Sequence, residues 1–140
     1  MPYTESVNGL IDEYIEKSRS VIANSRPGDG LMGFGNDPKK NPCHMEFYES
    51  MERLINEMVA SSPDPGEASS VAEILIKAPE TISCPDMCRW TLVAARQLAI
   101  PLIPYVTPEA KAELKAWFND FVPRRERLPV EKKLYSALSE

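Results

Sequence analysis

Hydrophobic residues recur at three- and four-residue spacings along most of this chain, and proline interrupts the pattern where each stretch ends. This period matches the roughly 3.6 residues per turn of an α-helix, so each stretch has one apolar face. Proline suits the first helical position and disrupts a helix interior, so the thirteen prolines keep the helices short. No stretch shows the sustained alternation of a strand. The sequence predicts an all-α, compact helical bundle of about five or six helices.

Caps and prolines place the first three helices. The first is expected over residues 4–24, where apolar residues occupy one face. The second is expected over residues 42–60, because Asn41 can cap it and Pro42 suits its first position. A short third helix is expected over residues 67–78.

A fourth helix is the most apolar of the chain. Ser83 and Asp86 resemble a capping box and would begin this helix, which is expected to extend to Ile100. Its apolar residues cover most of its circumference, which predicts a position at the centre of the bundle. Pro101 is expected to end or kink the helix, leaving residues 101–106 extended or irregular.

Two further helices are expected in the C-terminal part. Thr107 can cap a helix that begins at Pro108 and stops at Val122, and a last helix begins near Pro129. The aromatic cluster of the first of these helices is expected in the core, whereas an exposed tryptophan there would indicate a surface for a partner. The cluster consists of Trp117, Phe118 and Phe121.

The length, net charge and apolar runs of the chain exclude several classes of protein. The 140 residues fit one helical domain over 1–140. A net charge of −5 argues against general binding to nucleic acid or to anionic membranes. The most apolar run, residues 92–106, is shorter than the roughly 20 residues that cross a bilayer. Residues 1–20 lack the apolar run of a secretion signal and three cysteines cannot all pair, so we expect a cytoplasmic protein.

The segment 25–40 is a long connection between two predicted helices. Loops above about 12–15 residues without structure of their own are usually functional or disordered. Gly28, Gly30 and Gly33 match the spacing of a dinucleotide-binding loop. Such a loop leaves a strand and enters a helix at once, whereas this segment follows a helix and is separated from the next one. Glycines that serve turn geometry are therefore the favoured interpretation.

The same Gly-rich loop is the first place where we expect a contact surface. Its apolar residues Leu31 and Met32 indicate packing onto the core of the chain, a partner or a ligand. Its two lysines add positive charge. The expected ligand or partner residues of this loop are Gly28, Gly30, Gly33, Phe34, Lys39 and Lys40.

The cysteines and the single histidine form an alternative candidate site. Cys84 and Cys88 would share one face of the fourth helix, at a spacing that suits two ligands of one metal ion. Cys43 or His44 could add a third ligand of a tetrahedral zinc site. Paired C-x-x-C motifs are missing from the sequence. Free cysteines that act as small core residues are therefore the simpler interpretation.

Thiol chemistry is a related hypothesis. Cys43 and Cys84 are expected near helix N-termini, where the helix dipole stabilises a thiolate and lowers the thiol pKa. The same field would keep His44 neutral and available as a base. A pair formed by Cys84 and His44 requires that the starts of the second and fourth helices meet.

A local basic patch lies near the C-terminus. It contains Arg124, Arg125 and Arg127, with Lys132 and Lys133 further along. Such a patch could contact phosphate or an acidic partner, but a charge run beside a turn is usually solvated surface.

These patterns favour a non-enzymatic protein-interaction module, because no catalytic motif stands in its required context. We expect a protein partner or self-association, no cofactor and no binding to membranes or nucleic acid. One alternative is a small zinc- or thiol-dependent protein that uses the four Cys and His residues. The other is a ligand-binding protein in which the 25–40 loop acts as a lid.

Overall fold

The chain folds into helices over nearly all the residues that the computed structural model describes, which are 2–25 and 37–140. Within these ranges there are six α-helices and three 3₁₀ segments, without a strand. The all-α prediction is therefore confirmed. The α-helices are α1 (Pro2–Ala23), α2 (Cys43–Ala60), α3 (Pro65–Thr81), α4 (Asp86–Ala95), α5 (Pro108–Phe121) and α6 (Pro129–Leu138). The 3₁₀ segments are η2 (Pro38–Lys40), η3 (Arg96–Tyr105) and η4 (Arg124–Glu126).

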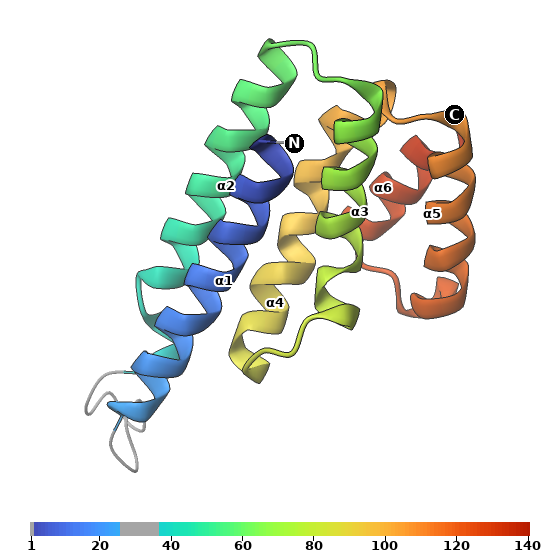
Figure 1. Cartoon of the computed structure of the whole chain (residues 1–140). Coiled ribbons are helices and arrows are strands. Elements are labelled where there is room, and N and C mark those ends of the chain that lie inside the picture. Colours follow the sequence, from blue (N-terminus) through green and yellow to red (C-terminus); the bar gives the residue numbers. More distant parts are fainter. Residues whose placement is uncertain (1, 26–36) are drawn as a thin grey trace.

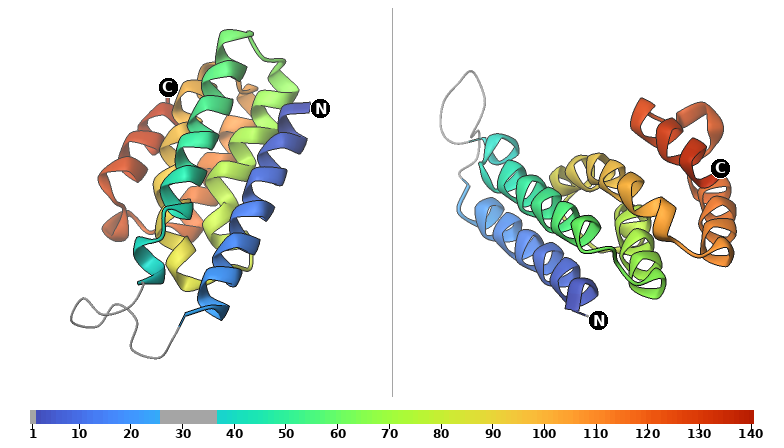
Figure 2. Two further views of the ribbon diagram at one scale, coloured as in Figure 1. Left: turned by 90° about the vertical axis from the view of Figure 1, so that its left-hand side faces the viewer. Right: turned by 90° about the horizontal axis from the view of Figure 1, so that it is seen from above.

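Three helical hairpins stand side by side (Figure 1). Seen from above in Figure 2, α1 and α2 form one outer pair, α3 and α4 the middle pair, and α5 and α6 the other outer pair. The middle pair, together with η3 that continues α4, contacts both outer pairs. Helix α3 packs on α1 and α5, and η3 packs on α2 and α6. The centre of the fold is therefore α3 with η3.

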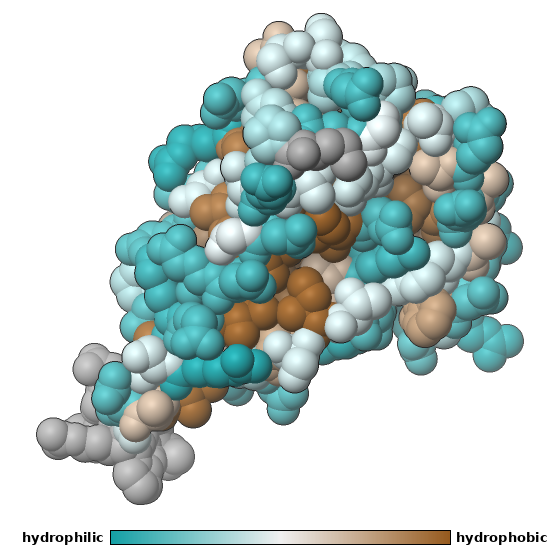
Figure 3. Space-filling model, viewed as in Figure 1, coloured by the Kyte–Doolittle hydropathy of each residue, from teal (hydrophilic) through white to brown (hydrophobic). Residues whose placement is uncertain are grey.

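Hydrophilic residues cover most of the face shown in Figure 3, whereas hydrophobic ones gather in the furrow between α1 and the middle pair. The core beneath receives side chains from every α-helix. None of the described helices combines the length and the apolar character that a membrane span requires. Fully buried core residues, one from each α-helix in turn, are Val7, Met51, Val71, Leu92, Phe118 and Leu134.

Short polar side chains begin the helices at the places where the sequence predicts caps. The Asn41 carboxamide oxygen accepts a hydrogen bond from the Cys43 N–H at 2.9 Å, at the start of α2. The Thr107 hydroxyl accepts from the Ala110 N–H at 3.2 Å, at the start of α5. Each bond satisfies one of the N–H groups that a helix start leaves without an internal partner. The predicted start of α5 at Pro108 is therefore confirmed, while α2 begins at Cys43, one residue after the predicted Pro42.

Helix α3 is longer than the predicted range of 67–78. It begins at Pro65, where the Asp64 carboxylate accepts from two backbone N–H groups, and it continues to Thr81. Pro79 is buried within its last turn. The carbonyl of Pro79 accepts a hydrogen bond from Arg89 at 2.7 Å, so a side chain of α4 satisfies an end carbonyl that the helix itself cannot.

The predicted fourth helix is wrong in its bounds. It begins at Asp86 without a side-chain cap, so Ser83 does not form a capping box. It ends at Ala95, and η3 continues the chain as a 3₁₀ helix through Pro101 and Pro104. The fixed φ of proline is compatible with 3₁₀ dihedral angles, so the chain stays helical where extended or irregular backbone is predicted.

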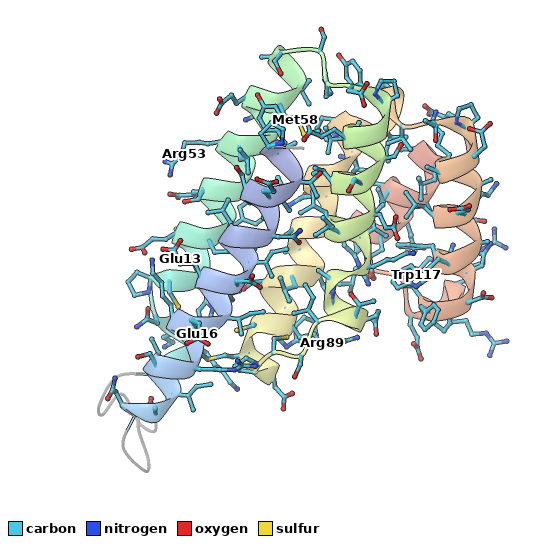
Figure 4. All side chains as sticks on the ribbon, in the orientation of Figure 1. Glu13, Glu16, Arg53, Met58, Arg89 and Trp117 are labelled. Carbon is cyan, nitrogen blue, oxygen red and sulfur yellow. The ribbon has the colours of Figure 1, made fainter. Side chains whose placement is uncertain are left out.

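The predicted central position of the fourth helix is confirmed, since α4 belongs to the middle pair (Figure 2) and η3 continues it through the centre, but the apolar residues of α4 are not buried all round the helix. Cys88 and Leu92 are buried on one face of α4, but Trp90 on the opposite face is 73% exposed. On α5, Phe118 is fully buried as predicted, whereas Phe121 is 55% exposed. Trp117 is half-buried and stacks on Phe121, and it points from α5 toward α3 (Figure 4).

A buried ion pair joins the middle hairpin to α6. Arg96, at the start of η3, is 1% exposed and pairs through Nη1 with the Glu131 carboxylate of α6. Its Nε donates to the Ile76 carbonyl of α3 at 2.8 Å. The second Glu131 oxygen accepts from the Leu128 N–H at 2.9 Å, which holds the start of α6. Burial lowers the pKa of Arg96, and the nearby Glu131 carboxylate opposes that shift.

Replacing Glu131 with alanine is expected to lower the free energy of unfolding by about 3–5 kcal/mol, because the buried Arg96 charge then keeps only its longer contact with the Glu80 carboxylate, at 3.6 Å. Urea unfolding followed by circular dichroism measures this loss. The control is Glu73→Ala, which removes an exposed partner of Lys77 and should cost less than about 1 kcal/mol. Equal losses in the two variants would contradict the structural role of the buried pair.

Candidate functional site

His44 lies in the first turn of α2 and both of its ring nitrogens have partners. Nδ1 lies 2.5 Å from the Tyr14 hydroxyl of α1, and Nε2 lies 3.0 Å from the Pro38 carbonyl of η2. A carbonyl only accepts, so Nε2 carries the proton and donates to Pro38. In the neutral ring Nδ1 then accepts from the Tyr14 O–H. Neither nitrogen is free to bind a metal without breaking one of these bonds.

The cysteines do not form the predicted arrangement on one helix. Cys84 lies in the connection before α4 and is half-buried, whereas Cys88 lies inside α4 and is fully buried. The prediction that both share one helix face is therefore wrong. Cys43 is buried at the start of α2, with its sulfur 4.0 Å from the Ser18 hydroxyl.

Tyr14 lies among His44, Cys43 and Cys88, three of the four residues of this candidate site. Burial raises the pKa of its hydroxyl, a Thr91 hydrogen bond opposes the shift, and the nearby Cys88 and Cys43 thiols raise it further. Elements α2 and α4 thus approach each other around the buried Tyr14 ring, which stacks on Phe47 with ring centres 4.3 Å apart. In the described ranges, no three His, Cys, Asp or Glu residues are placed to hold a metal ion.

The predicted lowering of the thiol pKa is wrong for two cysteines. Burial raises the pKa of Cys43, and the Ser18 hydrogen bond only partly opposes the shift. Burial also raises the pKa of Cys84. Desolvation of the thiolate outweighs the helix dipole at Cys43, and Cys84 precedes its helix rather than lying in the first turn.

Of the predicted Gly-rich loop, the structure describes Ser25 and residues 37–40. Lys39 and Lys40 lie in η2, where Asp37 caps the short turn by accepting from the Lys39 N–H at 3.0 Å. Both lysines are exposed. The remaining predicted contact residues of the loop, Gly28, Gly30, Gly33 and Phe34, lie outside the described residues.

Exposed large apolar side chains gather around Trp90. Five such residues are exposed in the described ranges, and four of them line two neighbouring grooves. Trp90 lines both grooves and therefore forms the ridge between them. We define the Trp90 surface by these four residues, which are Met45, Trp90, Phe121 and Leu128.

The first groove lies between α2 and α4. It has a volume of about 730 Å³, and Met45, Tyr48 and Trp90 supply its aromatic and apolar walls. Lys39, Lys40 and His44 also line it. The described end of the Gly-rich loop therefore borders this groove.

The second groove lies between α4 and the connection from α5 to α6. It has a volume of about 360 Å³, and Trp90, Phe121 and Leu128 are its exposed apolar walls. The buried Arg96 ion pair lies at its base. The charged residues that line it are Glu80, Asp86, Arg89, Arg96, Glu126 and Glu131.

Some of the charged residues that line the second groove form ion pairs with one another, and others do not. Arg89 lies 2.7 Å from the Glu80 carboxylate, and the Arg89 side chain is 51% exposed. At the rim, Asp86 and Glu126 are exposed and form no ion pair within the described parts of the chain. Figure 4 shows Arg89 beside the lower end of α3. The arginines that line the second groove are therefore paired with carboxylates of the same groove, and the exposed Asp86 and Glu126 give it an excess of negative charge.

Sequence reasoning missed the Trp90 surface, although one signal was present. Cys88, Leu92 and Ala95 repeat at helical spacing and are buried on one face of α4. Trp90 falls two residues after Cys88, which places it on the opposite face. Counting apolar residues around the whole helix places tryptophan in the core. Assigning each residue to one helix face from the Cys88, Leu92 and Ala95 repeat would have placed Trp90 on the exposed face.

The three thiols are expected to react slowly in the folded protein. At pH 8, Cys84 should react first with an aromatic disulfide reagent, yet more slowly than a free thiol because its raised pKa reduces the thiolate fraction. The buried Cys43 and Cys88 should react at least about 100-fold more slowly than in denaturant. Absorbance of the released thiolate follows the phases, and Cys84→Ser should remove the first. Fast labelling of Cys43 would contradict its burial.

Zinc is expected to have little effect on the folded protein. One equivalent should raise the melting temperature by less than about 1 °C, because His44 already uses both ring nitrogens. Scanning calorimetry with and without chelator measures the shift. A large rise that is lost in His44→Ala and in Cys88→Ser would instead support the zinc site predicted from the sequence.

Comparisons with known proteins point to no relative of this chain. No protein-family model matches it, and neither a curated protein nor a solved structure shows significant similarity to it.

Proposed function

We propose that this chain is a helical protein-interaction module that binds a partner protein at the Trp90 surface. The observation that carries the proposal is the exposure of Trp90, which is 73% accessible between two grooves. Exposed apolar side chains that occur singly are ordinary, but a contiguous apolar patch on a soluble protein is typical of a binding site. Here Met45 extends the patch into the first groove, and Phe121 and Leu128 extend it into the second.

The chemistry of the surface suits protein recognition. Tryptophan and methionine are enriched at protein interfaces, where large apolar side chains fill pockets of the partner. The Tyr48 hydroxyl in the first groove accepts a hydrogen bond from the Gln97 carboxamide, which holds that wall in place. A wall that is already ordered loses little conformational entropy when a partner binds.

The Gly-rich loop fits the same proposal. Lys39 and Lys40 belong to the contact residues predicted from the sequence, and both line the first groove beside Met45. Their positive charges and the carboxylates of Glu46 and Glu49 provide a polar rim around the apolar centre. This arrangement of an apolar centre and a polar rim is usual in protein interfaces.

Trp90→Ala is expected to weaken partner binding by at least about 30-fold, which corresponds to the roughly 2 kcal/mol of a strong interface residue. Tagged wild-type protein first retains partners from a lysate of its native cells, and calorimetry then measures the affinity of the purified partner. The wild-type, Trp90→Ala and Ile22→Ala proteins are compared at equal concentration.

Ile22→Ala is the matched control, because Ile22 is also an exposed large apolar residue but lines neither groove. It should bind like the wild type. If Trp90→Ala retains the same partners with the same affinity as Ile22→Ala, the Trp90 surface is not the binding site.

A further inference from the structure

We propose that the partner at the second groove is a second copy of this chain, related to the first by a twofold axis. This inference rests on the proposed function, because it assigns an occupant to part of the Trp90 surface. A twofold interface uses the same patch on both copies, so that patch must be complementary to itself. The region of η4 and the second groove has this property in its charges and in its apolar residues.

The charge pattern of this region is self-complementary. Asp86 and Glu126 give the groove a negative rim, while Arg124 and Arg125 stand exposed on η4 beside it. None of these four residues forms an ion pair within the described ranges of the chain. When η4 of one copy approaches the groove of the other, the guanidinium groups of Arg124 and Arg125 face the carboxylates of Asp86 and Glu126. The twofold axis repeats this pairing on the other side of the interface.

The neighbouring arginine has a different role. Arg127 is buried, and its Nε donates to the Val122 carbonyl at 3.0 Å. Its guanidinium lies over the Tyr135 ring, 4.2 Å from the ring centre, and donates to Asn119 at 2.9 Å. Arg127 therefore holds the connection between α5 and α6 in place, while Arg124 and Arg125 are exposed and accessible to a second copy.

The apolar residues supply the centre of the same patch. Phe121 and Leu128 stand at the two ends of the connection that carries η4, and Trp90 faces them across the groove. In a twofold pair these side chains meet their counterparts and lose their contact with water, which stabilises the pair. The charges surround this centre and fix the register of the two copies.

Charge reversal tests the pairing directly. An acidic variant carries Arg124→Glu and Arg125→Glu, and a basic variant carries Asp86→Lys and Glu126→Lys. Each reversed pair of residues is exposed in the folded chain, so both variants should fold, and circular dichroism checks this. Sedimentation velocity between about 1 and 200 μM measures the association of each protein, alone and in an equimolar mixture.

The wild type is expected to form a dimer over this range, and the dissociation constant should rise as salt screens the charges. Each variant alone should raise the dissociation constant at least tenfold, because like charges then face each other. The equimolar mixture should restore dimers, because both contacts of the mixed pair are again opposite in charge. Lys39→Glu with Lys40→Glu is the control, since it reverses two charges at the first groove only and should dimerise like the wild type.

A wild-type chain that stays monomeric at 200 μM, or a mixture that does not restore dimers, overturns this inference. These results leave the proposed function standing if Trp90→Ala weakens the binding of another protein as expected. If dimers form and only the second-groove variants disrupt them, the second copy is the occupant of this groove.

Discussion

The packing of the three hairpins depends on the buried guanidinium of Arg96. This group lies where the middle hairpin meets α6, and it bonds to the Ile76 carbonyl of α3 and to the Glu131 carboxylate. A buried charge is costly unless it is paired and hydrogen-bonded, so the elements that carry these partners are confined to one arrangement. The Phe118 ring lies 5.8 Å from the same guanidinium and closes the site from α5.

The candidate interface follows from this arrangement. Since Glu131 also holds the Leu128 N–H, the start of α6 and the connection before it are fixed relative to α4. The second groove is the space that remains between these elements, with the ion pair of Arg96 at its base and Trp90 at its edge. The proposed partner surface is thus a consequence of how the third hairpin docks on the second.

Much of the fold could be predicted, whereas the candidate site could not. Asn41 and Thr107 cap the helices at the predicted places, because a cap acts on backbone groups within a few residues. The course of the chain through Pro101 was not foreseen, since proline excludes one hydrogen bond but leaves both 3₁₀ and extended backbone available. The thiol predictions failed for Cys84 because they depended on a helix start that lies two residues later in the structure.

The sequence by itself determined the helical class, the positions of several helix starts and the amphipathic faces, because these depend on local periodicity, caps and prolines. The tertiary structure alone decided that Arg96 is buried, that Tyr14 binds His44 and that Trp90 remains exposed. Each of these outcomes depends on which helix packs against the face that carries the residue. An apolar pattern shows that a face is suited to burial, but only the packing of the hairpins decides which faces are covered.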